Sequence, residues 1–137
     1  MSSLPLPDIS DPEFVAYFQG CRLGELRVHQ CSDCLTKRWP PRPTCSQCGS
    51  AQYSWIPIGG RGQIYSFIVV HRAEGAAFAD RLPYTVVVVE HSDEPSIRFL
   101  GNMVECDPAE LAIGQPVEAV FQEFAEGVVM PNWRLVR

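Results

Sequence analysis

The sequence predicts a mainly β protein in which a small cysteine-rich ribbon precedes a five-stranded barrel. Two Cys-x-x-Cys pairs lie close together in residues 31–48, and five longer strand-like segments follow Gly59. Five such segments, with a short helical segment between the third and the fourth, have the element order of an OB-fold barrel. We expect an N-terminal tail and helix over residues 1–24, a rubredoxin-like zinc ribbon over residues 25–58 and an OB-fold domain over residues 59–137.

The composition is that of an ordinary globular protein. Of the 137 residues, 46% are hydrophobic and 20% are charged. The longest apolar runs, such as residues 85–89, are far shorter than the roughly 20 residues that cross a bilayer. The first residues have neither the basic start nor the apolar segment of a secretory signal. We therefore expect a cytoplasmic protein, in which paired cysteines indicate metal or redox chemistry rather than disulfides.

One helix is expected over residues 11–22. Ser10 is its predicted N-cap, and Glu13 stands three residues later, where it completes a capping box. Gly20 weakens the helix and Gly24 ends it. Apolar residues at helical spacing give this short helix a large apolar face, which must pack on the barrel or on a partner: Phe14, Tyr17 and Phe18.

The strands are expected where apolar and β-branched residues gather between turn signals. Two short strands over residues 26–29 and 53–56 belong to the ribbon. Asp107 is the predicted cap of a short helical turn over residues 107–111. The five expected barrel strands cover residues 63–71, 84–91, 97–104, 117–124 and 128–136.

Four cysteines carry the strongest chemical signal in the chain. They form two Cys-x-x-Cys knuckles separated by ten residues, and two such knuckles supply the four soft ligands that zinc prefers in a tetrahedron. Gly49 follows the second knuckle and suits the backbone turn that a knuckle often needs. We expect one structural Zn²⁺ held by Cys31, Cys34, Cys45 and Cys48.

Other interpretations of the cysteine pattern have less support. Disulfides need an oxidising compartment, and a thioredoxin-like centre needs one Cys-x-x-Cys beside a βαβ pattern that this sequence lacks. Iron remains the alternative metal because rubredoxin-type sites use the same ligands, and we favour zinc because closed four-cysteine ribbons are most often structural zinc sites. Cys21 and Cys106 are expected to be small buried apolar residues, and His29 a strand residue rather than a spare ligand.

The charge balance makes nucleic acid an unlikely partner. The chain has 11 basic and 16 acidic residues and a net charge of −5, whereas nucleic-acid binders usually carry a basic surplus. Over residues 25–48, four thiolates and one divalent cation cancel the small basic excess. We hypothesise that the basic residues beside Trp39 contact phosphates such as those of coenzyme A, the alternative being a solvated loop with a packed tryptophan: Lys37, Arg38 and Arg42.

No catalytic set is expected in this chain. The sequence has no Gly-x-Ser-x-Gly elbow, and a closed four-cysteine zinc has no open position to activate water. Cys106, His91 and Asp93 are the residue types of a catalytic triad, but each has an ordinary structural explanation. From its residues, the chain is a zinc-stabilised binding or scaffolding module.

Several segments resemble the zinc-ribbon and OB-fold proteins that accompany thiolases. Residues 60–70 (GRGQIYSFIVV) look like the first barrel strand of that family, residues 101–104 (GNMV) like its third, and residues 113–121 (IGQPVEAVF) like the entry to its fourth. The resemblance covers about residues 11–136. One departure is Ser46-Gln47 between the second pair of cysteines, where many relatives have Pro or Ala, and it should not disturb metal binding.

The resemblance implies a non-catalytic accessory subunit of a thiolase-type acyl-CoA complex, such as an acyltransferase, thiolase or aldolase. The thiolase-fold partner would carry the nucleophilic cysteine, and this subunit would hold the assembly together and help close the acyl-CoA site. OB-folds often bind ligands with the loop between their first two strands, here residues 73–83, so Phe78 is a candidate contact for acyl-CoA or the partner. A plain surface loop is the alternative. Two other functions stay open: a stand-alone acyl-CoA-binding module and, less favoured, a single-strand nucleic-acid binder.

Overall fold

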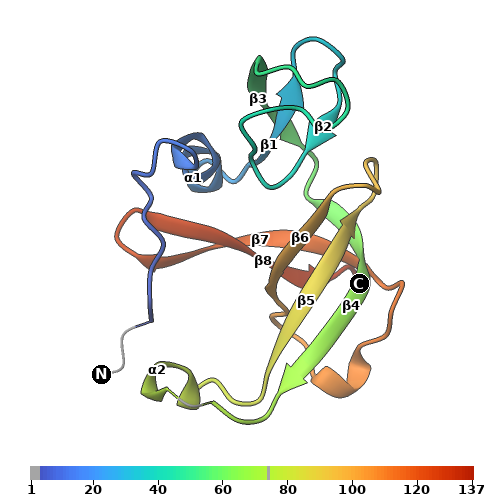
Figure 1. Ribbon diagram of the computed structural model, residues 1–137. Helices are drawn as coiled ribbons and strands as arrows, with labels where there is room; N and C mark the ends of the chain where they lie inside the picture. Colours follow the sequence, from blue (N-terminus) through green and yellow to red (C-terminus); the bar gives the residue numbers. More distant parts are fainter. Residues whose placement is uncertain (1–3, 74) are drawn as a thin grey trace.

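A computed structural model describes residues 4–73 and 75–137 and contains two antiparallel β-sheets. A three-stranded sheet in the order β2-β1-β3 forms the ribbon, and a five-stranded sheet in the order β6-β5-β4-β7-β8 forms the barrel (Figure 1). In chain order the elements are α1 (Val15–Arg22), β1 (Leu26–Cys31), β2 (Lys37–Arg38), β3 (Tyr53–Ile58), β4 (Arg61–Val70), α2 (Ala76–Ala79), β5 (Tyr84–His91), β6 (Arg98–Asn102), the 3₁₀ turn η1 (Pro108–Glu110), β7 (Pro116–Ala125) and β8 (Val128–Leu135).

The five-stranded sheet closes on itself as the sequence predicted for an OB-fold. Strand β4 is shared by both halves: it pairs with β5 along most of its length and with β7 through Arg61–Gln63. A β-bulge after Ile64 bends it between the two partners. The open ends β6 and β8 meet where the Val104 amide donates to the Trp133 carbonyl at 2.8 Å, so the sheet becomes a barrel.

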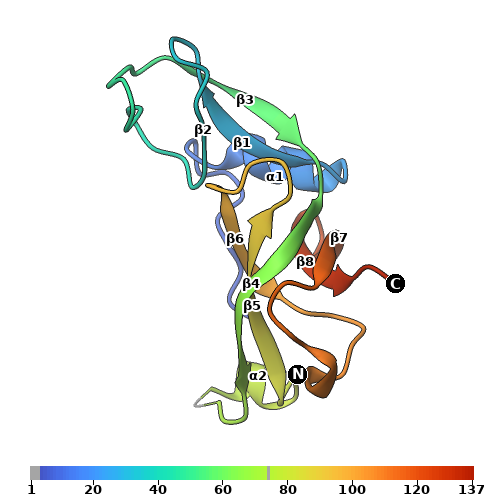
Figure 2. The same cartoon turned by 90° about the vertical axis from the view of Figure 1, so that its right-hand side faces the viewer.

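The ribbon and the barrel share one hydrophobic core. Trp133 of β8 is fully buried at its centre, and Leu26 and Val28 of ribbon strand β1 belong to the same cluster of buried residues. Gly101 of β6 lets the backbone pass close to the indole, since a Cβ there would lie 2.9 Å from Trp133 Cδ1. Figure 2 shows the ribbon stacked on one end of the barrel, with α1 beside the junction.

The N-terminal helix is shorter than predicted, and the capping box is wrong. Helix α1 begins at Val15 and has no side-chain cap. Ser10 instead donates its backbone N–H (3.0 Å) and its hydroxyl (2.6 Å) to Asp8 Oδ1, while Asp11 Oδ1 accepts from the Glu13 amide at 3.0 Å. Asp8 and Asp11 thus form local turns that take the capping groups before the helix starts.

The remaining connections differ less from expectation. Asp107 caps the short 3₁₀ turn as predicted, since its Oδ1 accepts from the Ala109 amide at 2.9 Å. The segment expected as a loop over residues 73–83 contains the four-residue helix α2, and Glu74 lies outside the described residues. Among the helices that the structure describes, none has the length and apolar character needed to span a membrane.

Candidate metal centre and its surroundings

Four cysteine sulfurs converge at the tip of the ribbon. The Sγ atoms of Cys31, Cys34, Cys45 and Cys48 all lie within 4.8 Å of one another. Cys31 and Cys48 are 3.5 Å apart, Cys34 and Cys45 are 3.6 Å apart, and none is in a disulfide. A zinc ion with Zn–S distances of about 2.3 Å places its sulfurs about 3.8 Å apart in a tetrahedron. The donor set therefore fits a four-coordinate zinc ion.

The first knuckle is built by the end of β1. The Cys31 amide donates to the Thr36 carbonyl at 2.9 Å, and the Leu35 amide donates to the Cys31 carbonyl at 3.0 Å. This turn requires a left-handed residue, and Leu35 takes that conformation with φ of 65° although it is not a glycine.

The second knuckle repeats the same hydrogen bonds with a better-suited residue. The Cys45 amide donates to the Ser50 carbonyl and the Gly49 amide to the Cys45 carbonyl, both at 2.8 Å. Gly49 has φ of 78°, which is the turn conformation that the sequence predicted for it. The two knuckles are therefore structural repeats that differ at the left-handed position.

The electrostatics of the cluster disfavour four thiolates in the absence of a cation. The backbone N–H of Cys34 lowers the pKa of Cys31, and a hydrogen bond with the Thr36 hydroxyl, 3.1 Å from the sulfur, lowers the pKa of Cys34 to about 6. Cys48 behaves oppositely: the Ser50 N–H acts to lower its pKa, but hydrogen bonding with Cys31, burial and the other sulfurs raise the pKa to about 12. Without a positive ion, four thiolates do not coexist at neutral pH.

His29 lies near the cysteines but is not part of the cluster. It belongs to β1, as predicted, and its ring stacks on Tyr53 at 3.9 Å and meets Trp55 edge-on at 4.4 Å, measured between ring centroids. Neither ring nitrogen has a hydrogen-bond partner among the described residues. Burial, and then the charge of Arg38, lower the pKa of His29 to about 4, so the ring is neutral.

The basic group predicted to contact phosphates lies at the joint between ribbon, helix and barrel. Lys37 Nζ pairs with Glu94 Oε1 of the β5–β6 turn at 2.7 Å. Arg38 is only 8% exposed and donates to the Arg42 carbonyl at 3.0 Å, and the Trp39 ring stacks on Tyr17 of α1 at 4.4 Å. Contact of these residues with acyl-CoA or a partner stays a prediction.

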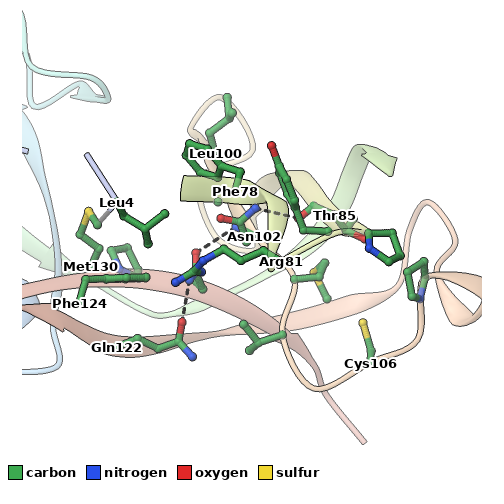
Figure 3. Close-up of a pocket in the computed structure, with 18 of the residues that line it drawn as sticks. Leu4, Phe78, Arg81, Thr85, Leu100, Asn102, Cys106, Gln122, Phe124 and Met130 are labelled. Carbon is green, nitrogen blue, oxygen red and sulfur yellow. Dashed lines mark hydrogen bonds between the residues drawn. The ribbon is translucent and has the colours of Figure 1, made fainter. Parts of the chain in front are cut away.

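Phe78 is not brought together with that basic group. It lies on α2, which Figure 1 places at the end of the barrel away from the ribbon, and its ring packs near Tyr84 at 5.9 Å. There it lines a groove of about 580 Å³ between α2, β6 and the β7–β8 hairpin (Figure 3). The sequence did not reveal this groove, although Asn102 and Asn132, two amides within apolar strands, were a signal for it.

Both ring nitrogens of His91 form hydrogen bonds that give this residue a structural role. Its Nδ1 accepts from the amides of Asp93 (3.2 Å) and Glu94 (3.1 Å), so the proton resides on Nε2, which donates to the Gly59 carbonyl at 2.7 Å. Asp93 contacts the imidazole through its backbone rather than its carboxylate. His91 thereby ties the β5–β6 turn to the linker between ribbon and barrel. Cys21, also in question from the sequence, is 1% exposed, and burial raises the pKa of its thiol to about 11.

Two family models and a solved structure match this architecture. The rubredoxin-like zinc ribbon domain of ChsH2 matches residues 18–54, and the C-terminal OB-fold domain of ChsH2 matches residues 55–122. A chain of the Ltp2-ChsH2(DUF35) aldolase superposes with a TM-score of 0.84 at 30% identity, covering 94% of this chain and 98% of that chain.

Three curated relatives extend the comparison. A probable enoyl-CoA hydratase alpha subunit of Thermomonospora curvata is 33% identical over 86% of this chain and 36% of its own length. A 3-oxo-4,17-pregnadiene-20-carboxyl-CoA hydratase alpha subunit of Mycobacterium tuberculosis is 30% identical over 95% of this chain and 42% of its own length. The chain thus spans less than half of each hydratase subunit. A DUF35 domain-containing scaffold protein of Methanocaldococcus jannaschii is 34% identical over 71% of this chain and 67% of its own length. This chain joins a ChsH2-type zinc ribbon to an OB-fold domain, and it belongs to the DUF35 family.

Proposed function

We propose that this chain is a zinc-binding scaffold subunit, without catalytic residues of its own, of an acyl-CoA enzyme whose partner has a thiolase fold. The observation that carries the proposal is the likeness to a chain of the Ltp2-ChsH2(DUF35) aldolase, which extends over 98% of that chain. The name of that aldolase joins a DUF35 chain to a second protein. The Methanocaldococcus jannaschii relative is itself named a scaffold protein.

The acyl-CoA class is supported by the two hydratase subunits. Both are named for CoA-linked substrates, and this chain aligns with 36% and 42% of their lengths. The thiolase fold of the partner rests on the resemblance of residues 60–70, 101–104 and 113–121 to proteins that accompany thiolases.

The metal would make the ribbon a rigid part of such a scaffold. Cys31, Cys34, Cys45 and Cys48 are the residues that would hold zinc. When bound, zinc supplies a cross-link among four thiolates and has no open position for water or substrate. Because Cys31 ends the strand whose Leu26 and Val28 enter the barrel core, order in the knuckles extends to the joint with the barrel.

We assign contacts with acyl-CoA or the partner to those predicted side chains that stay accessible. Arg42 is exposed, so its guanidinium is available to a phosphate of coenzyme A, and Phe78 is half-buried on the groove. Lys37, Arg38 and Trp39 already have intramolecular partners, and we assign them to the joint that presents Arg42. The stand-alone acyl-CoA-binding module remains the competing function, because the groove offers a cavity on this chain alone.

Co-purification from the native host tests the proposal. We expect the affinity-tagged full chain to bring down an untagged thiolase-fold protein in stoichiometric amount, and the pair to act on an acyl-CoA that neither protein turns over alone. The variant Cys31→Ser should lose the partner, whereas Cys106→Ser should keep it. A monodisperse monomer from native extracts would refute the scaffold role. Micromolar acyl-CoA binding by that monomer, about −8 kcal/mol by calorimetry, would support the stand-alone module.

A further inference from the structure

The groove at the end of the barrel has the size and composition of a small-molecule site. Its volume of about 580 Å³ lies within the range of about 300–1,000 Å³ that ligand pockets occupy. The walls come from separate parts of the chain: the N-terminal tail, α2 and the segment after it, β6, and the β7–β8 hairpin (Figure 3). Large apolar side chains dominate these walls: Leu4, Phe78, Leu100, Phe124 and Met130.

A ladder of amides holds the polar side of the groove in place. The Asn102 backbone N–H donates to Asn132 Oδ1 at 3.0 Å, and Asn132 Nδ2 donates to Gln122 Oε1 at 2.7 Å. Asn102 Nδ2 donates to the Thr85 carbonyl at 3.1 Å. These bonds hold the side-chain amide of Gln122 through its oxygen. The Nε2 atom of Gln122 has no hydrogen-bond partner among the described residues. The ladder therefore leaves a hydrogen-bond donor for a ligand.

The groove carries a positive side chain in a protein of negative net charge. Its 20 described lining residues include Arg81 and no Asp or Glu, although the chain has 16 acidic residues and a net charge of −5. Arg81 reaches from the end of α2 over the Phe124 ring, with its Cζ 6.0 Å from the ring centroid. No carboxylate of the described residues lies within ion-pair distance of its guanidinium. A cation beside apolar walls attracts an anion that carries an apolar tail.

We propose that this groove binds one amphipathic carboxylate, with the carboxylate at Arg81 and Gln122 Nε2 and the apolar chain against Leu100, Phe124 and Met130. A carboxylate offers only acceptors, and both groups at the polar end are donors. Leu100 is 72% exposed, so an apolar chain would remove a large leucine surface from water. The site does not depend on the scaffold role. Co-purification can fail while the carboxylate still binds, and the carboxylate can fail to bind while co-purification succeeds.

Octanoate titrated into the ¹⁵N-labelled full chain is the test, with the side-chain amide signals of Asn102, Gln122 and Asn132 as the readout. We expect a saturable shift of these signals at a single site. Octylammonium, which has the same chain and the opposite charge, is expected to bind at least about tenfold more weakly. Equal binding of the two probes, or no saturable shift with octanoate, would overturn the proposal.

Two matched pairs of variants test the polar end. Arg81→Gln should weaken octanoate binding about tenfold, whereas Arg72→Gln, an exposed arginine in the same connection, should not. Gln122→Glu keeps an oxygen for Asn132 Nδ2 but replaces the free donor by a negative charge, so it should abolish binding. Gln19→Glu on the exposed side of α1 adds the same charge elsewhere and should leave binding unchanged. If both members of a pair behave alike while their backbone spectra stay native, the carboxylate does not sit at Arg81 and Gln122.

Discussion

The knuckle region of the ribbon and the barrel contain very different amounts of buried side chain. Between Cys31 and Tyr53 only three residues are buried, whereas the barrel surrounds the fully buried Trp133 with a cluster of buried valine, isoleucine and phenylalanine side chains. A segment with so little core needs another source of order, and a metal is the usual one in small domains. Strand β1 belongs to both regions, since it ends in Cys31 and places Leu26 and Val28 in the barrel core. The two regions should therefore respond differently to the same kind of damage.

Replacing one of the four cysteines that we propose to hold zinc should have the largest effect. Cys31→Ser or Cys45→Ser is expected to lose the metal and unfold the knuckles, because metal-binding energy there is folding energy on the order of 10 kcal/mol. Elemental analysis and amide NMR would check this, with signals of the barrel strands retained. Cys106→Ser serves as the control and should keep the metal. Near-stoichiometric metal in Cys31→Ser would contradict the expectation.

Damage to the barrel core should spread further than damage to the knuckles. Trp133→Ala is expected to lower the free energy of unfolding by about 3–5 kcal/mol, since it empties the centre of the shared core. Urea unfolding followed by circular dichroism measures the loss, and Ile113→Ala, at a residue 70% exposed, is the matched control. If Trp133→Ala left the urea midpoint unchanged, the shared core would not be the source of barrel stability.

The buried His29 should make the ribbon sensitive to acid. Its pKa is about 4 in the folded chain, against an ordinary value of about 6.5, so the unfolded chain binds more protons in that interval. The contribution of His29 to stability is complete above about pH 6.5 and falls as the pH drops toward 4. His29→Phe keeps an aromatic ring between Tyr53 and Trp55 and removes the titration.

Urea unfolding of both proteins at a series of pH values measures this effect. The stability of His29→Phe should decline less than that of the native chain between pH 6.5 and 4. Protonation of the cysteine ligands affects both proteins alike, so only the difference between them reports on the histidine. Parallel pH curves would show that His29 is not buried as a neutral ring.

The smallest expected effects come from the left-handed positions of the two knuckles. Gly49→Ala should destabilise the ribbon by about 1 kcal/mol through backbone strain alone, because a Cβ at Gly49 meets no atom within 4 Å. Leu35→Gly relieves the same strain and should be neutral or stabilising by less than about 1 kcal/mol, since glycine gains entropy in the unfolded chain. Competition with a chelator measures the metal affinity of each variant. This affinity should fall in Gly49→Ala and should stay unchanged or rise in Leu35→Gly. Destabilisation of equal size in both variants would contradict the conclusion that the two knuckles are structural repeats that differ at the left-handed position.

The features that the sequence predicted are those with local signals. The spacing of the four cysteines indicated the cluster, Gly49 indicated the turn, and residues 84–91 formed the expected strand without a change of bounds. The helix start was wrong because Asp8, only two residues from Ser10, takes the capping hydroxyl. Competition between such neighbouring polar groups is decided by small energy differences.

The features that the sequence did not reveal depend on residues far apart in the chain. Lys37 finds its partner Glu94 57 positions later, and Trp39 stacks on Tyr17 of the preceding helix. A cluster of basic residues beside a tryptophan looks the same in the sequence whether it faces solvent or a joint. The groove combines the tail, α2, β6 and the β7–β8 hairpin, and apart from the amides of Asn102 and Asn132 no signal in these segments marks it.

The proposed dependence of the ribbon on a bound metal is tested most directly by the metal content of the purified full chain, followed by NMR before and after chelation. We expect one zinc ion per chain and, on its removal, loss of the ordered amide signals of residues 32–52 while those of β5 and β8 persist. A metal-free chain whose ribbon keeps its signals, or a ribbon whose four sulfurs are paired in disulfides, would contradict that expectation.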